Sequence, residues 1–182
     1  MNMKAQFWSF DVIFSIVIFS VAITVLAFTW YQINSQLSIA YGNGAMIMQL
    51  QAGALASMLL SPGSPSNWNS YVNTTNTSTW SGISIGIGTN TSSIDPNKLY
   101  TLMSMANYNY QATKQALGVG FDYYITITGQ TSRGGALNIS IGENPGAHGA
   151  LTVYVEKRSS YIDGMPVQVV IELWTNTPFG VE

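Results

Sequence analysis

The fold is decided by the stretch Val12-Ile-Phe-Ser-Ile-Val-Ile-Phe-Ser-Val-Ala-Ile-Thr-Val-Leu-Ala-Phe-Thr-Trp30, which contains no proline, glycine or charged residue. As an α-helix it would be about 28 Å long, close to the hydrocarbon thickness of a bilayer. Trp8, Trp30 and Tyr31 flank it in the manner of an interfacial aromatic belt. The sequence therefore predicts an N-terminal helix that inserts into a membrane.

Charge is scarce in this chain and unevenly placed. Of its 182 residues 47% are hydrophobic and 8% are charged, and the formal net charge is −2. No Asp, Glu, Lys, Arg or His occurs between Asp11 and Asp95. This composition excludes a nucleic-acid binder, which needs a basic face to neutralise phosphates. The lack of cysteine excludes disulfides, thiolate metal sites and cysteine nucleophiles.

A secretory signal peptide is the alternative reading of the apolar stretch. Signal peptides have a basic start, an apolar run of about 7–15 residues and a small-residue cleavage site. Here Lys4 is the only basic side chain before the run, the run is longer, and no such site follows. We therefore expect a retained single-pass helix over residues 7–41. The lone Lys4 predicts a cytoplasmic N-terminus, with the rest of the chain outside the cell.

A second helical stretch is predicted over residues 45–60, which are good helix formers. Gly42-Asn43-Gly44 predicts a kink or a short melted stretch between two helical halves, and Ser61-Pro62-Gly63-Ser64-Pro65 ends the second half. Five apolar residues of this half recur near helical spacing and predict its buried face: Ile47, Leu50, Ala54, Leu55 and Met58.

Residues 61–94 form a polar segment rich in Ser, Thr, Asn and Gly, which we expect to be a loop. Asn-x-Ser/Thr sequons occur at Asn73, Asn76 and Asn90, and a fourth lies at Asn138. In a segment predicted to be extracellular, these are candidate sites of covalent N-glycans. The alternative is that an Asn- and Thr-rich loop generates sequons by chance.

The rest of the chain predicts a compact extracellular domain over residues 42–182. Asp95-Pro96 reads as a helix N-cap with proline at the first helical position, and a second helix is expected over 110–117, before Gly118. Within residues 119–175, four runs alternate apolar and polar residues with a period of two, which predicts an antiparallel sheet with one buried face. The residue 45–60 helix would cover that face, so the fold class is α+β.

A long apolar N-terminal helix packed on an antiparallel sheet resembles the type IV pilin architecture. Lys4-Ala5-Gln6 resembles the class III signal of archaeal pilins, and Phe7 followed by Asp11 is similar to the start of mature bacterial type IV pilins. Residues 60–68 and the end from Val155 to Trp174 also look like an archaeal pilin-like family.

This resemblance implies a leader over residues 1–6 and processing by a prepilin peptidase at Lys4, Ala5, Gln6 and Phe7. A cut before Gln6 places Asp11 at the sixth mature position, and a cut before Phe7 places it at the fifth. The resemblance also implies that Asp11 meets the amino terminus of a neighbouring subunit during assembly. The alternative is that Asp11 only lies at headgroup level near a helix N-terminus, where the dipole favours an anion.

No constellation for catalysis, metal or cofactor binding is found in the sequence, so we expect no enzyme. His148 is the only histidine, in a glycine-rich loop, and we expect it to be solvated. Gly82–Gly88 lacks the lysine and the helix of a phosphate loop, and Glu156-Lys157-Arg158 reads as a solvated strand end. We expect the aromatic residues of the domain to serve packing; the alternative is a sugar-binding surface.

The leading expectation is a pilin: a structural subunit of an extracellular type IV pilus-like filament, in which copies of the chain form a helical homopolymer through packing of their N-terminal apolar helices. The resemblance implies the membrane as a reservoir before assembly and a pilus assembly machinery as partners. The surface domain would then supply adhesion. A different class is a monomeric, membrane-anchored surface protein that binds a glycan or another partner, and a third is a virion or envelope protein.

Overall fold

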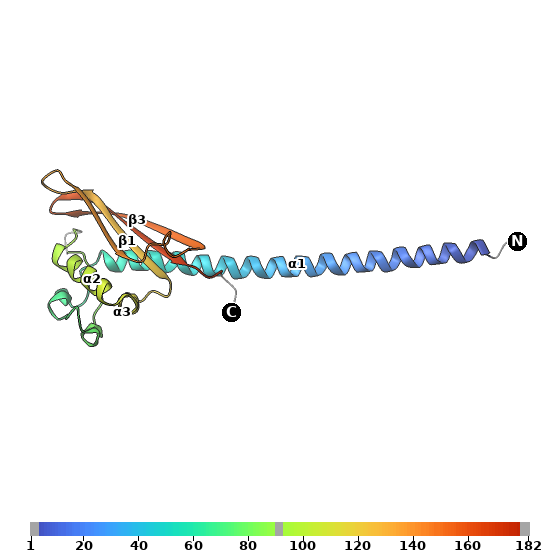
Figure 1. Ribbon diagram of the computed structural model, residues 1–182, viewed down its shortest axis with the longest axis horizontal. Helices are drawn as coiled ribbons and strands as arrows, with labels where there is room; N and C mark the ends of the chain where they lie inside the picture. The colour runs from blue at the N-terminus through green and yellow to red at the C-terminus, as the bar shows by residue number, and fades with distance from the viewer. Residues whose placement is uncertain (1–3, 90–92, 179–182) are drawn as a thin grey trace. The chain divides into compact units, whose positions relative to one another are not determined.

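The chain is α+β, with an apolar N-terminal helix and a C-terminal four-stranded antiparallel sheet (Figure 1). The computed structural model describes residues 4–89 and 93–178; along the first helix it describes the side chains of residues 11–33, of residue 35 and from residue 43 onward. The chain divides into two compact units, Met1–Asn43 and Gly44–Glu182. The second unit holds the sheet.

Helix α1 (Lys4–Leu59) is a single α-helix of 56 residues. Residues 42–44 are helical, so the expected melted stretch does not occur. A glycine in a helix costs about 1 kcal/mol relative to alanine, which the strong helix formers after residue 44 offset. The helix ends where expected, shortly before Pro62 and Gly63, whose φ is +77°.

The C-terminal part of α1 lies in the core of the second unit, as predicted, but on a different face. Its buried residues recur at i, i+4, i+7, i+8 and i+11, and they are Met48, Ala52, Leu55, Ala56 and Leu59. Of the expected stripe, Leu55 is buried and Met58 packs partly against the core. Ile47 and Leu50 are 49% and 62% exposed. This part of the helix is apolar on more than one side, so its periodicity alone could not select the face.

The segment expected to be a polar loop contributes to the core as well. It contains two short 3₁₀ helices, η1 (Trp68–Ser70) and η2 (Thr77–Trp80). Five of its residues join the hydrophobic cluster: Trp68, Trp80, Ile85, Ile87 and Ile94. A Cβ at Gly86 or Gly88 would overlap the backbone of residues 60–61, so glycine allows these two stretches to run in contact.

The two helices that follow have the predicted start at Asp95 and the predicted end before Gly118, and α3 has in addition a cap that was not predicted, at Asn109. Asp95 accepts hydrogen bonds from the backbone N–H groups of Asn97 and Lys98 at the start of α2 (Pro96–Tyr108), with Pro96 in its first turn. The side chain of Asn109 caps α3 (Tyr110–Ala116) through the N–H of Ala112. Gly118 follows with a φ of +68°, the left-handed conformation that a helix C-terminus favours.

The sheet is built from β1 (Asp122–Gln130), β2 (Ala136–Gly142), β3 (Thr152–Ile162) and β4 (Met165–Thr175). Its strand order is β2-β1-β4-β3, and each neighbouring pair is antiparallel. Buried residues of the two central strands alternate along one face, and they are Tyr123, Ile125, Ile127, Val167, Val169, Ile171 and Leu173. Trp174, on the opposite face of β4, is buried as well. The four predicted strands are confirmed, and the core lies on one face of the sheet as predicted.

In strand β3 the face that carries the alternating apolar residues is not the face that is buried. Tyr154 pairs with the buried Leu173, so Tyr154 shares the core face, whereas Val153 and Val155 lie on the opposite face. Both valines remain exposed, at 41% and 43%. Register with β4 thus decides which side of β3 is buried, because neighbouring positions on paired strands share a face.

Candidate functional site

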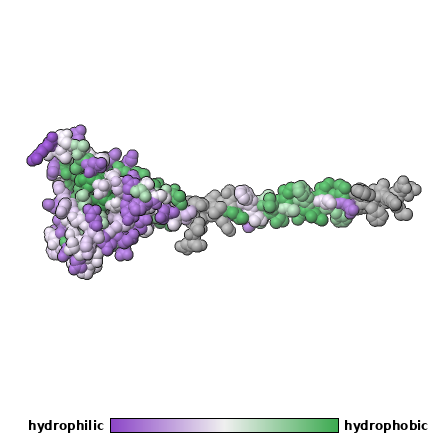
Figure 2. Space-filling view, viewed as in Figure 1, coloured by the Kyte–Doolittle hydropathy of each residue, from purple (hydrophilic) through white to green (hydrophobic). Residues whose placement is uncertain are grey.

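The first candidate site is Asp11 together with the apolar helix that follows it. Asp11–Ile33 is 23 residues long, is apolar enough to cross a membrane, and buries none of its residues within the chain. Figure 2 shows hydrophobic residues along most of this stretch. Its large side chains are 49–74% exposed. This segment therefore presents an apolar surface that its own unit does not cover.

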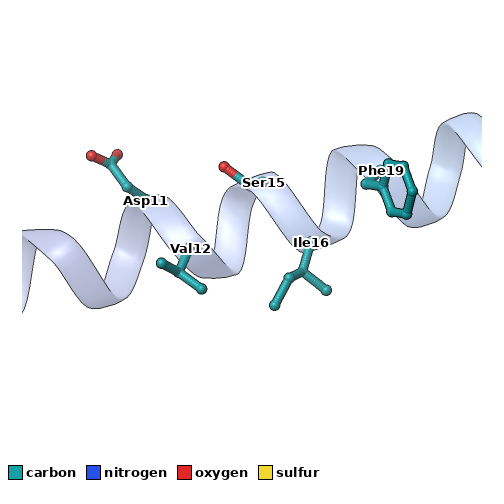
Figure 3. Close-up of a pocket in the computed structure, with 5 residues that line it drawn as sticks. All are labelled: Asp11, Val12, Ser15, Ile16 and Phe19. Atoms are coloured by element: carbon teal, nitrogen blue, oxygen red, sulfur yellow. The ribbon is translucent and has the colours of Figure 1, made fainter.

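Asp11 projects from this helix, and no described side chain pairs with its charge. Figure 3 shows its carboxylate pointing away from the helix, on the same side as Ser15, with Val12 and Ile16 on the opposite side. Together with Phe19, these residues line a shallow surface groove. All of them lie on the same helix, so the groove is not an enclosed binding pocket. Among the described residues, ion pairs occur at Lys114–Asp122 and Arg158–Glu156, and none involves Asp11. A carboxylate at the end of an apolar span is costly unless a partner neutralises it.

Two hydroxyl groups inside the span are satisfied by the helix itself. Thr24 donates from Oγ1 to the carbonyl of Ser20 at 2.8 Å, and Thr29 donates to that of Val25 at 2.8 Å. In an apolar environment an unbonded hydroxyl is expensive, so these internal bonds adapt the segment to lipid or to tightly packed helices.

The predicted processing residues lie in the first turns of α1. Lys4, Ala5, Gln6 and Phe7 have a helical backbone, and their side chains fall outside the described residues. The choice between a cut before Gln6 and one before Phe7 stays a prediction from the sequence.

Three of the four predicted glycosylation residues are exposed, and Asn90 lies outside the described residues. The Oδ1 atom of Asn73 accepts hydrogen bonds from the backbone and the hydroxyl of Thr75, and Oδ1 of Asn76 does the same with Ser78. Asn138 is exposed on the outer face of β2. At Asn73 and Asn76 these bonds occupy Oδ1 rather than Nδ2, the atom to which an N-glycan is attached.

No group of three or more His, Asp or Glu that could hold a metal ion occurs among the residues that the structure describes. His148 is exposed, and its ring stacks on Trp174 with centroids 5.6 Å apart. Trp174 is buried and donates from Nε1 to the carbonyl of Glu143 at 2.9 Å. Trp174 thus attaches the loop that contains His148 to the sheet, and the stacking of His148 on Trp174 is part of this packing.

The aromatic side chains divide between the two roles considered from the sequence. Trp68, Trp80, Tyr123 and Trp174 are buried and serve packing. Four others in the second unit are exposed by more than half: Tyr71, Tyr100, Tyr108 and Tyr161.

The second candidate site is a polar groove beside Lys98, which the sequence analysis missed. Lys98 is only 6% exposed, and its Nζ donates to the carbonyls of Pro62 at 2.8 Å and Gly88 at 3.2 Å. The signal was available, because Leu102 and Met105 lie four and seven residues further along α2 and are buried. A lysine at the same helical spacing as core residues is expected to reach into the core.

This groove has a volume of about 280 Å³. Its lining is polar apart from one proline, and it consists of Pro62, Ser66, Asn67, Asn69, Thr89, Asp95 and Lys98. The loop from residue 61 supplies the first four, and α2 with its cap supplies Asp95 and Lys98. The groove thus combines a buried ammonium, a carboxylate, amides and hydroxyls.

Apart from the two candidate sites, a cluster of polar side chains joins α3 to the start of β1. The hydroxyl of Tyr110 donates to Oδ1 of Asp122 at 3.1 Å, and Lys114 Nζ lies 2.7 Å from the same oxygen. Burial is the main cause that raises the pKa of Tyr110, and the negative charges of Asp122 and Glu143 add to it, while the N–H of Tyr123 opposes the rise. Burial, followed by Glu143, also raises the pKa of Tyr123. Both phenols therefore stay neutral, which suits structural roles.

In comparisons with protein-family models, curated proteins and solved structures, nothing matches this chain. The function of this chain must therefore be inferred from its own two candidate sites, the apolar helix with Asp11 and the groove at Lys98.

Proposed function

We propose that this chain is the pilin of an extracellular, type IV pilus-like filament, held as a single-pass membrane protein before assembly. The observation that carries the proposal is the apolar helix Asp11–Ile33, none of which is buried, with a carboxylate at its start that forms no ion pair within the described residues. Lipid would cover this surface before assembly, and equivalent helices of other subunits would cover it in the filament core.

The chemistry of the helix supports an exchange between these two environments. Both are apolar, so the hydrophobic effect does not distinguish them, and association depends on close packing and on pairing of polar groups. Asp11 supplies the polar group: its pairing with the amino terminus of the next subunit would neutralise two charges at once. Residues 7–41 would then form the filament core, after prepilin peptidase has removed the leader.

The C-terminal unit would form the filament surface. It carries the exposed sequon residues Asn73, Asn76 and Asn138, which would bear N-glycans outside the cell. Its part of α1 also keeps an uncovered apolar side at Met46, Ile47 and Leu50, each about half exposed or more. An uncovered apolar side on a helix that already packs on its own sheet favours a further protein neighbour.

Shearing cells, pelleting the released fibres and taking the intact mass of this chain tests the proposal. Recovery of the chain in the fibre fraction is the expected result, and the mass distinguishes a start at Gln6 from one at Phe7 and reports any glycan. Recovery at full length in the membrane pellet alone would overturn the filament and favour the second candidate. That candidate is a monomeric membrane-anchored surface protein whose domain binds a ligand, and the polar groove at Lys98 is the observation in its favour.

A further inference from the structure

We infer that the groove at Lys98 binds a neutral polyhydroxylated ligand, in particular one sugar residue of a glycan. The inference concerns the C-terminal unit alone and holds for either proposed function, because it does not depend on assembly of the N-terminal helix. Four features carry it: unpartnered polar side chains, a buried ammonium with a spare donor, a neutralising carboxylate, and a suitable size.

The polar side chains of one loop line this groove and have no hydrogen-bond partner among the residues that the structure describes. Ser66, Asn67 and Asn69 all line it. Within the described residues, the hydrogen bonds found elsewhere in this loop involve its backbone, Ser61 and Trp68, and none involves these three side chains. Two amides and a hydroxyl offer donors and acceptors in comparable numbers. Such a mixed set suits a ligand whose groups both donate and accept, as sugar hydroxyls do.

Lys98 determines which charged ligands the groove rejects. An ammonium carries three N–H donors, and the carbonyls of Pro62 and Gly88 take two of them in the described part of the chain. The third donor is available to a ligand oxygen. A metal cation is excluded, because the ammonium already occupies the two carbonyl oxygens that could bind it and would repel a second positive charge.

Asp95 balances the charge of Lys98. Its Oδ1 accepts the N–H groups of Asn97 and Lys98, while Oδ2 has no hydrogen bond within the described residues. Because this carboxylate lines the same groove as the ammonium, an anion attracted by Lys98 also meets Asp95. A neutral ligand escapes this repulsion and can still donate a hydroxyl hydrogen to Oδ2 and accept one from Lys98.

The size of the groove limits the ligand to one ring. Pockets for drug-sized molecules measure about 300–1,000 Å³, and this groove, with about 280 Å³, lies just below that range. A single hexose ring is therefore the expected occupant, with the rest of a glycan extending into solvent.

The test is saturation-transfer NMR on the full chain in a detergent without a sugar headgroup. The neutral probes are glucose, galactose, mannose and N-acetylglucosamine, and the charged probes are glucuronate and glucosamine. The variant is the double substitution Asn67→Ala with Asn69→Ala, since these amides lie at the surface loop and their loss spares the core. Asn107→Ala is the matched control, because Asn107 is exposed at the other end of α2, away from the groove residues.

We expect at least one neutral sugar to bind, the double variant to weaken its binding about tenfold or more through the lost hydrogen bonds, and Asn107→Ala to leave it unchanged. Three results would overturn the inference: no neutral probe binds, glucuronate or glucosamine binds more tightly than every neutral probe, or the double variant binds as the unchanged chain does. None of these results bears on recovery of the chain in sheared fibres, so the two proposals fail separately.

Discussion

The hydroxyl of Tyr110 accepts a hydrogen bond from the backbone N–H of Tyr123 at 3.0 Å, while the two rings stack with their centroids 5.0 Å apart. Tyr110 belongs to α3 and Tyr123 to β1, so this contact attaches the short helix to a central strand of the sheet. The two hydroxyls differ in their hydrogen bonding. The Tyr110 hydroxyl donates to Asp122, whereas the Tyr123 hydroxyl is buried and has no partner in the described residues.

This difference predicts opposite effects of the same substitution. Tyr110→Phe removes the acceptor of a backbone N–H and should lower the free energy of unfolding by about 1–3 kcal/mol. Tyr123→Phe removes a hydroxyl buried without a partner and should leave that free energy unchanged or raise it by about 1 kcal/mol. Chemical unfolding followed by tryptophan fluorescence measures both, since Trp68, Trp80 and Trp174 are buried in this unit. Equal destabilisation by both would contradict the assignment.

The same pair predicts a loss of stability in alkali. The pKa values of Tyr110 and Tyr123 in the folded chain lie above the ordinary 10.0, mainly because of burial. Above that pH the unfolded chain releases phenol protons that the folded chain still holds, so the free energy of unfolding falls as pH rises. Below it both states keep the protons and these groups add no pH dependence. Unfolding measured from pH 8 to pH 11 should show a shallower decline for Tyr123→Phe than for the unchanged chain; an identical slope would refute this origin.

Lys98 should be more important for stability than an exposed lysine. Lys98→Met keeps the unbranched apolar stem of the side chain but leaves the carbonyls of Pro62 and Gly88 without their donor. We expect a loss of about 2–4 kcal/mol in the free energy of unfolding. Lys157→Met, on the exposed outer face of β3, is the control and should change stability by less than about 0.5 kcal/mol. A similar change in stability for the two variants would show that the hydrogen bonds from Lys98 to Pro62 and Gly88 do not stabilise the fold.

Two glycine-to-alanine changes should have opposite signs. At Gly88 a Cβ would overlap the carbonyl of Leu60, so Gly88→Ala must separate two packed backbones and should cost more than about 2 kcal/mol. At Gly53, inside α1, a Cβ meets nothing within 4 Å. Gly53→Ala should therefore stabilise the chain by about 0.5–1 kcal/mol through helix propensity. Thermal unfolding ranks the two variants, and a tolerated Gly88→Ala would contradict the close approach.

Asp11 should control assembly without controlling membrane insertion. If it pairs with a neighbouring amino terminus, Asp11→Ala leaves that charge unneutralised in an apolar core, and filaments should disappear from the sheared fraction. The apolar helix is unchanged, so the chain should stay in the membrane pellet. Ser15→Ala, one turn later on the same side of the helix, is the matched control and should assemble normally (Figure 3). Normal filaments from Asp11→Ala would mean that Asp11 only lies at headgroup level.

Local sequence signals predicted the elements of this fold well. Asp95-Pro96 and Gly118 mark helix ends through bonds and backbone angles that involve only near neighbours, so they can be recognised without a tertiary structure. Alternation likewise predicted all four strands. The buried sides were harder to predict, because α1 from residue 44 and β3 are apolar on more than one side, and only packing and register select between them.

The two candidate sites also differ in how far the sequence alone could reveal them. Asp11 is conspicuous in the sequence because charge is otherwise missing from its surroundings, and its proposed partner belongs to another copy of the chain. The Lys98 groove joins residues of the loop Pro62–Asn69 to Thr89, Asp95 and Lys98, which lie twenty or more positions further along the chain. Its existence depends on the close backbone approach at Gly86 and Gly88, for which the sequence has no local signal.

The internal hydrogen bonds of Thr24 and Thr29 bear on the reversibility of the proposed filament. Because each hydroxyl already bonds to its own helix, leaving lipid breaks no hydrogen bond at these positions, and entering a bundle requires none to form. These two hydroxyls would therefore favour neither the bilayer nor the filament, which leaves that balance to helix packing and to Asp11.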